Sequence, residues 1–318
     1  MADPQVVMML VARLLMWMVA TVYFFLESLV LCLIPRSYRR KDIKGNVVLV
    51  TGGGSGIGRL MCLKLAARGA VVVTWDVSEA GNEETVRQVQ AAGGQCHGYV
   101  VDLCDRQAVY AAATRLKQEV GHVDILVNNA GVVTGKNIME SPDDSIQRTF
   151  DVNAICHFWT TKAFLGHMLA QNKGHIVTIA SMAGKMACSG LVDYCASKYA
   201  AVGFHETLQA ELKANGKDGV KTTCVCPVVI STGMFQGAES KYFPTLVPDF
   251  VAGEVVDAIL MNTSTLYLPN YMWLMPSADA DVPSKVHGHA GGNPGNEGAH
   301  EELSWAGGRL SDLPGCLT

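Results

Sequence analysis

The chain has 318 residues, of which 49% are hydrophobic and 17% charged, and its formal net charge is −4. This length and apolar content suffice for one large domain with a buried core. A charge so close to neutral excludes the basic surface of a nucleic-acid-binding protein. The 10 cysteines include no CxxC pair with zinc-site spacing, so we expect reduced thiols and no metal site.

An apolar run over residues 6–34 dominates the N-terminal region, residues 1–35. As a helix it would be about 43 Å long, against roughly 30 Å for the hydrocarbon core of a bilayer. We expect an uncleaved membrane anchor, which either spans the bilayer or lies in one leaflet; a buried core helix is the alternative. The basic residues that follow predict that the main domain faces the cytosol: Arg36, Arg39, Arg40, Lys41 and Lys44.

From residue 46 onwards, short apolar runs rich in β-branched residues alternate with longer stretches of helical periodicity. The predicted strands are 46–51, 70–75, 97–101, 123–128, 175–180, 220–226 and 265–269. This alternation predicts an α/β domain with a doubly wound parallel sheet, a Rossmann fold, over residues 42–276. The Gly-rich, polar composition of residues 277–318 predicts a disordered tail.

A glycine-rich loop, residues 50–60, closes the first predicted strand and opens the first helix. Glycine is needed where backbone turns sharply and approaches a pyrophosphate, and the helix N-terminus attracts negative charge. An ordinary strand-to-helix turn is the alternative, but the position after the first strand favours a dinucleotide site. The residues expected to form it are Thr51, Gly52, Ser55, Gly56, Ile57 and Gly58.

Two carboxylates extend this predicted site. Asp76 lies 18 residues after Gly58, near the spacing at which an acid meets the adenosine ribose hydroxyls, so we expect NAD(H) rather than NADP(H). The alternative for Asp76 is an exposed loop residue. Asp102, after the third strand, is placed to bond the adenine amino group. After the fourth strand, in residues 128–131, we expect a side-chain amide to brace adjacent strand ends and Asn128 to be among the cofactor-binding residues. Ala130 and Gly131 are expected to let the cofactor pass close.

These motifs together resemble the short-chain dehydrogenase/reductase family over residues 46 to about 270. Its further marks here are Asn153, Ser181 and the pair Tyr194-xxx-Lys198. A closer likeness, to the membrane-bound branch of retinol and 17β-hydroxysteroid dehydrogenases, is carried by residues 157–164, 174–178, 193–198, 201–206 and 232–235. The resemblance implies NAD(H)-dependent oxidoreduction of a lipophilic alcohol, ketone or aldehyde. It also implies location at the endoplasmic reticulum membrane or lipid droplets, and a homodimer.

The residue types fit alcohol oxidation, which needs a base for the hydroxyl proton. Tyr194 and Lys198 share one helix face, and we expect the ammonium to lower the phenol pKa from about 10, making Tyr194 the acid/base group. Ser181 is expected to bond the substrate oxygen, and the resemblance places Lys198 on the nicotinamide ribose. Asn153 is expected to hold a water that relays protons beyond Lys198; a structural helix-interior Asn is the alternative.

The segment after the sixth strand departs from the family pattern. Val228 stands after Pro227 where the family has glycine, which puts the nicotinamide geometry in doubt, although Ile230 and Thr232 still match the carboxamide-binding positions. The aromatic, Pro-rich residues 233–250 are expected to form an apolar wall for the substrate, with ordinary loop packing as the alternative. Two other functions stay open: a lipid carbonyl reductase working in the opposite direction, and a cofactor-binding membrane or lipid-droplet protein without turnover.

Overall fold

The computed structural model describes residues 4–235 and 244–274, with some side chains of the first two helices excepted. The predicted tail, 277–318, and the middle of the predicted substrate loop, 236–243, lie outside these residues. The apolar N-terminal run forms helix α1 (Pro4–Leu33), as expected, and a short α2 (Arg36–Arg39) follows it. Within the described part of the chain, no helix combines the length and the apolar character needed to cross a membrane.

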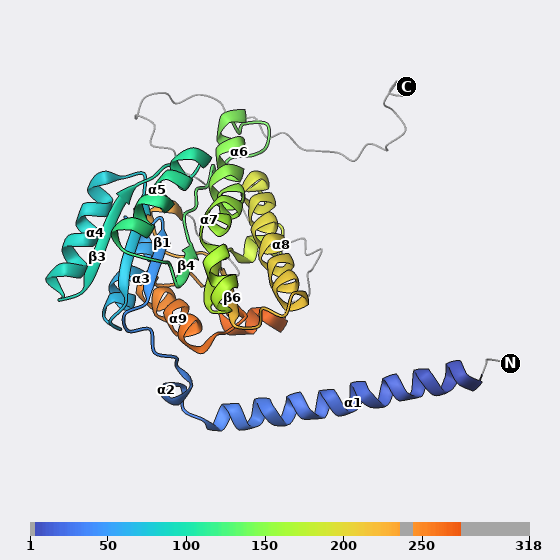
Figure 1. Ribbon diagram of the computed structural model, residues 1–318. Coiled ribbons are helices and arrows are strands. Elements are labelled where there is room, and N and C mark those ends of the chain that lie inside the picture. The colour runs from blue at the N-terminus through green and yellow to red at the C-terminus, as the bar shows by residue number, and fades with distance from the viewer. Residues whose placement is uncertain (1–3, 236–243, 275–318) are drawn as a thin grey trace, which may run out of the picture. The chain divides into compact units, whose positions relative to one another are not determined.

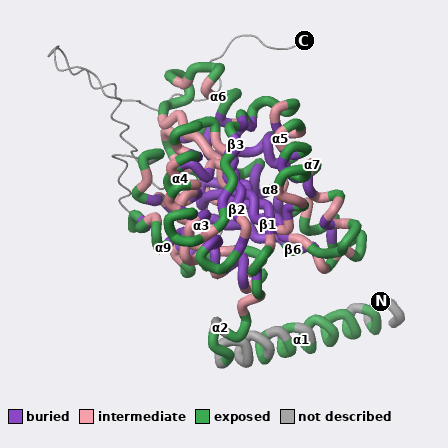
Figure 2. Tube along the Cα trace, turned by 60° about the vertical axis from the view of Figure 1, so that its left-hand side comes forward, coloured by how far each residue is buried: buried purple, intermediate pink, exposed green. Residues whose placement is uncertain are grey.

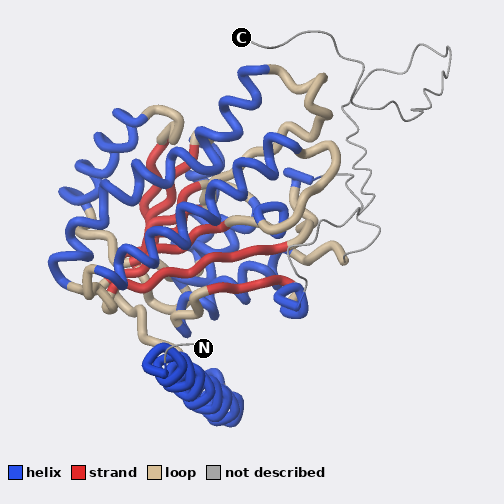
Figure 3. The backbone as a smooth tube through the Cα atoms, turned by 90° about the vertical axis from the view of Figure 1, so that its right-hand side faces the viewer, coloured by secondary structure: helices blue, strands red, loops and turns tan. Residues whose placement is uncertain are grey.

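The main domain is built on one sheet of parallel strands (Figure 3). Their order in the sheet is β3-β2-β1-β4-β5-β6-β7. The strands are β1 (Val47–Thr51), β2 (Val71–Asp76), β3 (Gln95–Val100), β4 (Ile125–Asn128), β5 (Gly174–Ile179), β6 (Val220–Pro227) and β7 (Thr265–Leu268). Every strand predicted from the sequence is confirmed. The apolar residues of the central strands are buried on both faces of the sheet, whereas the edge strands β3 and β7 are partly exposed.

Helices cover both faces of this sheet (Figure 1). One face packs against α3 (Gly56–Ala66), α4 (Glu79–Ala91) and α9 (Pro248–Met261). The other packs against α5 (Arg106–Glu119), α7 (Cys156–Gln171) and α8 (Val192–Ala214). A short α6 (Asp143–Phe150) runs into α7 through a π-helical turn, η1 (Asp151–Ile155). The short 3-10 turns are η2 (Met182–Gly184), η3 (Gly233–Phe235) and η4 (Asn270–Leu274).

The buried residues concentrate on the central strands (Figure 2). All five residues of β1 are buried, and each large apolar side chain removed from water contributes about 1.5–3 kcal/mol. On the α5–α7 face, Trp75 packs against Phe164 with 5.7 Å between ring centroids. The core therefore fixes the strand ends from which the site residues project.

The strand order reverses direction between β1 and β4. From β1 the chain builds outwards through β2 and β3, and then returns to the other side of β1 with β4. At such a switch point, the loops beyond the carboxyl ends of the strands diverge to opposite faces and leave a crevice for ligands. Both the glycine-rich loop after β1 and the segment after β4 lie at this crevice.

Candidate active site

A cavity of about 530 Å³ lies at the carboxyl ends of the strands, a volume in the usual range for a small-molecule site. It takes residues from the loops after β1 to β6 and from α8. The predicted site residues that line it are Gly52, Ser55, Gly56, Ile57, Gly58, Asp76, Asp102, Ala130, Gly131, Ser181, Tyr194, Lys198, Pro227, Ile230 and Thr232. Thr51, Asn128 and Asn153 lie behind its wall.

The glycine-rich loop has the shape that its sequence predicts. Gly52 has φ +64°, and a Cβ there would lie 2.8 Å from the Cα of Ala130. A Cβ on Gly58 would lie 2.1 Å from the carbonyl oxygen of Gly52. At Gly56, with φ +52°, a Cβ would meet Thr232 at 3.9 Å and no other described atom within 4 Å. Gly52 and Gly58 thus keep the turn tight, while Gly56 leaves free space on the cavity side, as a pyrophosphate cradle requires.

Asp76 is held firmly at the end of β2. Its Oδ2 accepts a hydrogen bond from the amide of Gly54 at 2.9 Å, and its Oδ1 accepts one from Ser78 at 3.0 Å. These bonds tie the carboxylate to the glycine-rich loop while it still lines the cavity. Asp102 also lines the cavity, and its Oδ1 accepts from the amide of Cys104 at 2.9 Å.

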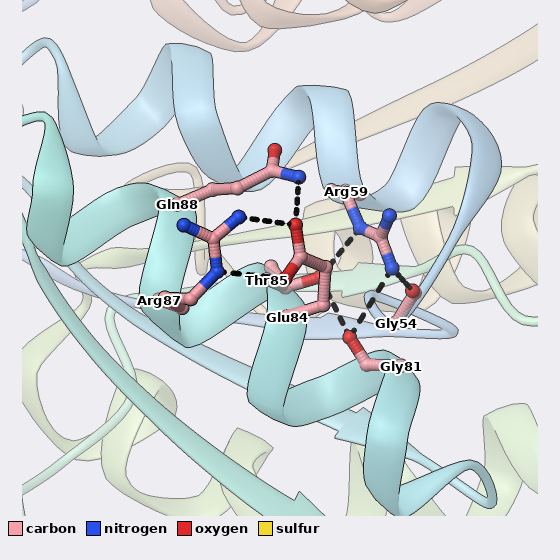
Figure 4. Close-up of polar contacts among 7 residues, drawn as sticks. All are labelled: Gly54, Arg59, Gly81, Glu84, Thr85, Arg87 and Gln88. Atoms are coloured by element: carbon pink, nitrogen blue, oxygen red, sulfur yellow. Dashed lines mark hydrogen bonds and ion pairs between the residues drawn. The ribbon is translucent and has the colours of Figure 1, made fainter.

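Arg59, which the sequence analysis missed, clamps the same loop from α3 (Figure 4). Its guanidinium donates to the carbonyl oxygens of Gly54 and Gly81, and its Nε donates to Thr85 Oγ1 at 3.0 Å. Thr85 in turn donates to the carbonyl of Gly53 at 2.9 Å. An Arg three residues into the helix after such a loop is the sequence signal that could have suggested this clamp.

The side-chain amide that braces the adjacent strand ends, expected within residues 128–131, belongs to Asn129. Asn128, expected at the cofactor, does not line the cavity. The Nδ2 of Asn129 donates to the carbonyls of Thr51 and Gly52, at 2.8 and 3.2 Å. Thr51 Oγ1 accepts from the amides of Asn129 and Ala130, which completes the β1–β4 link. Asn128 points away from the cofactor crevice, and its Oδ1 accepts from Thr160 of α7 at 2.8 Å.

At the other end of the cavity, Ser181, Tyr194 and Lys198 converge. Ser181 follows β5 and is hydrogen-bonded to the Tyr194 side chain. Lys198 lies one helical turn beyond Tyr194, with its Nζ 5.7 Å from the phenol ring centroid. That Nζ donates to the carbonyl of Ile179 at 2.9 Å. A phenol, a hydroxyl and an ammonium therefore share one buried corner.

Burial controls the protonation of this corner more than the sequence suggested. Burial raises the pKa of Tyr194 well above its usual value near 10, and the hydrogen bond from Ser181 lowers it in part. Burial also lowers the pKa of Lys198 to about 8. The expected lowering of the phenol pKa by Lys198 is absent, because the ammonium bonds a backbone carbonyl and is itself desolvated.

Asn153 lies in the π-helical turn η1, a form often found at functional sites. Its Oδ1 accepts from the amide of Val132 at 2.8 Å, and its Nδ2 donates to the carbonyl of Val132 at 2.9 Å. The Nδ2 also donates to Ser197 Oγ at 3.0 Å, a partner that the sequence analysis missed. The side chain thus braces the segment after β4, as a structural Asn does, and the water relay stays a prediction.

Val228, which stands where the family has glycine, causes no backbone strain. Its φ is not positive, so the position does not require glycine, and its amide donates to Leu268 at 2.9 Å. Beyond it, Ile230 forms a bridge with Leu246, which fixes the exit of the strand. The cavity wall near Tyr194 is apolar, with side chains from Val132, Met182, Met186, Leu191 and Met234.

Comparisons with known proteins agree with this geometry. Residues 46–242 match the short chain dehydrogenase family. Human epidermal retinol dehydrogenase 2 is 42% identical over 86% of this chain and 89% of its own length. Human 17-beta-hydroxysteroid dehydrogenase 13 is 42% identical over 88% of this chain and 92% of its own length.

Solved structures give the same answer for the fold. A short chain dehydrogenase/reductase from Burkholderia phymatum in complex with NAD has a TM-score of 0.67 and 29% identity, covering 74% of this chain and 92% of its own. A metagenomic short-chain oxidoreductase in complex with NADP has a TM-score of 0.60 and 29% identity, and the match covers 71% of this chain and 96% of that chain. The fold and site define a dinucleotide-binding α/β protein of the Rossmann type. The chain belongs to the short-chain dehydrogenase/reductase family.

Proposed function

We propose that this protein transfers hydride between NAD(H) and a lipophilic alcohol, ketone or aldehyde of the retinoid or hydroxysteroid class. One observation carries the proposal: Ser181, Tyr194 and Lys198 converge in the same cavity as the glycine-rich loop. The relatives named for retinol and 17β-hydroxysteroid dehydrogenation, matched over most of their length, support the substrate class.

The proposed roles follow from the side-chain chemistry. Ser181 orients the substrate oxygen, and Tyr194 takes the hydroxyl proton in oxidation and returns it in reduction. A bound NAD(H) would supply the hydride chemistry. Lys198 would hold the nicotinamide ribose, and Asn153 keeps the segment after β4 in place beside it.

Asp76 supports NAD(H) as the cofactor. A carboxylate fixed beside the adenosine position accepts hydrogen bonds from ribose hydroxyls and repels a 2′-phosphate. Ser55 and Val77, the neighbouring positions at which a cation would favour NADP(H), are uncharged. The NAD-bound structural neighbour is consistent with this choice.

The N-terminal helix supports attachment to a lipid surface. Its apolar side chains are exposed at many positions, among them Leu14, Trp17 and Phe25. We place the protein at the endoplasmic reticulum membrane or at lipid droplets with its catalytic domain in the cytosol, where a lipophilic substrate is delivered from lipid. A homodimer is part of the proposal on family grounds. Loss of the full chain from floated droplets after Leu14→Ser and Trp17→Ser together would support the attachment, and unchanged flotation would refute it.

The direct test is a substrate panel. The full chain, in detergent, is incubated with NAD or NADP and all-trans-retinol, estradiol or a long-chain alcohol, and NADH or NADPH absorbance is followed. We expect NAD-dependent turnover of at least one lipid alcohol, and its loss in Tyr194→Phe. Turnover retained by Tyr194→Phe would refute the acid/base role. NADH binding without turnover of any substrate would favour a cofactor-binding protein instead.

A further inference from the structure

Two cysteines lie beside Tyr194 and take no part in the proposed chemistry. Cys188 lines the cavity from the loop before α8 and is partly exposed. Cys195 is buried in the first turns of α8, directly after Tyr194. The Sγ of Cys195 donates to the carbonyl oxygen of Cys188 at 3.9 Å, and the two thiols lie close enough to shift each other's pKa. The pair is thus in contact, and one of its members can be reached from the cavity.

The pair differs chemically from the isolated cysteines Cys96, Cys104 and Cys156. Hydrogen bonding between the two thiols lowers the pKa of Cys195 to about 7 and raises that of Cys188. Burial instead raises the pKa of Cys96 and of Cys156 to about 12, and that of the exposed Cys104 to about 11. Because the thiolate is the reactive form, the lowered pKa of Cys195 favours oxidation of the pair. Cys188 is the cysteine of the pair, and of the residues that line the cavity, that an oxidant there would meet.

A second contacting pair provides a contrast. Cys224 and Cys226 lie on β6 with 3.9 Å between their sulfurs, but they are 2% and 0% exposed. Neither of them lines the cavity. An oxidant in the cavity therefore reaches Cys188 and does not reach the β6 pair.

We propose that Cys188 and Cys195 form a redox modification site, a dithiol that a peroxide converts to a disulfide in the wall of the substrate cavity. One sulfur, as thiolate, attacks a peroxide oxygen; the O–O bond breaks, leaving a sulfenic acid and releasing water or an alcohol once protonated. The second thiol then attacks that sulfur, expels water and gives up its proton. The two sulfurs supply the two electrons that reduce the peroxide.

The disulfide would act on the reaction through Tyr194, a consequence that rests on the proposed function. The bond closes a ring over residues 188–195 and brings the sulfurs to about 2.05 Å, closer than two hydrogen-bonded thiols. Tyr194 packs in the same cluster as Cys195 and Leu191, so this movement displaces the phenol. A shift of about 1 Å in a reacting group costs on the order of a hundredfold in rate.

The test treats the reduced full chain with hydrogen peroxide or, separately, with a fatty-acid hydroperoxide. Non-reducing peptide mass spectrometry then maps disulfides, and turnover is measured before and after dithiothreitol. Cys195→Ser removes the site, and Cys104→Ser and Cys224→Ser are the matched controls. Faster reaction with the fatty-acid hydroperoxide would indicate that the oxidant enters from lipid, and faster reaction with hydrogen peroxide that it enters from water.

We expect a Cys188–Cys195 disulfide in the wild type and both controls, with turnover falling about a hundredfold and returning with dithiothreitol. Cys195→Ser should keep its turnover under peroxide. Absence of the 188–195 linkage would overturn the site whether or not any substrate is turned over. A complete linkage with unchanged turnover in an active enzyme would overturn the effect on Tyr194.

Discussion

The two ends of the cavity are built by different means. At the adenosine end, backbone groups of the glycine-rich loop form the surface, and Asp76, Arg59 and Asn129 hold that backbone by hydrogen bonds. At the reaction end, the side chains of Ser181, Tyr194 and Lys198 form the surface. Cofactor binding at the adenosine end thus depends on the backbone conformation, and reactivity at the other end depends on the protonation of buried groups.

This difference determines how each end responds to change. A methyl group can obstruct the adenosine end, because its function is close approach of backbone to a pyrophosphate. At the reaction end, removing a charge or a hydroxyl matters most, because burial displaces the pKa values of Tyr194 and Lys198 in opposite directions. Substitutions at the first end should change cofactor affinity, and those at the second should change turnover and its pH dependence.

The largest effect is expected from Lys198→Met at the reaction end. Turnover should fall about a hundredfold, because the nicotinamide ribose loses the ammonium proposed to hold it in place. In the wild type, kcat/KM for oxidation should decline as pH rises through about 8, where the Lys198 ammonium is lost, and this alkaline decline should vanish in the variant. Lys185→Met, which breaks an ion pair with Glu206, is the control and should keep the wild-type profile. If kcat/KM of Lys198→Met still declined through pH 8, the decline would belong to another titrating group.

At the adenosine end, Gly56→Ala should weaken NADH binding about tenfold or more, roughly 1.4 kcal/mol, because its Cβ enters the cavity. Gly93→Ala is the matched control: its φ is also positive, +81°, and no described atom lies within 4 Å of its Cβ. Both variants should lose similar stability from backbone strain. Equal NADH affinity in the two, measured by fluorescence titration, would argue against a pyrophosphate at Gly56.

A charge change at the same end sharpens the comparison further. Asp76→Asn should reduce the preference for NAD over NADP roughly fivefold to tenfold, since the carboxylate no longer repels a 2′-phosphate. The ratio of kcat/KM with NAD to kcat/KM with NADP measures this preference. Asp218→Asn, at an exposed position, is the control and should leave the ratio unchanged. A preference that survives Asp76→Asn would mean that another group selects the cofactor.

Asn129→Leu, which removes the link between the ends of β1 and β4, is expected to change stability more than turnover. The free energy of unfolding should fall by about 1–3 kcal/mol, because the carbonyls of Thr51 and Gly52 lose their partner. Urea denaturation measures this, with the exposed Asn215→Leu as the control. If both variants are equally stable, the Asn129 bonds contribute nothing to the fold.

The same contrast explains how far the sequence could predict this protein. The strands and the glycine-rich loop follow from local patterns: apolar runs that need burial, and glycines where a Cβ would collide. The hydrogen bonds of Asn129 and Arg59 could not be predicted in this way, because their acceptors become neighbours only in the folded chain. The pKa of Tyr194 was misjudged for a similar reason, since its desolvation comes from the whole surrounding core and not from residues near it in sequence.

Transfer of deuterium tests the central claim most directly. The full chain is incubated with NAD and the best alcohol of the panel, deuterated at the carbinol carbon, and the nicotinamide is analysed by mass spectrometry. We predict one deuterium on the reduced cofactor with the wild type and almost none with Tyr194→Phe at equal NADH affinity. Unlabelled NADH from the wild type, or equal labelling by both proteins, would contradict the account.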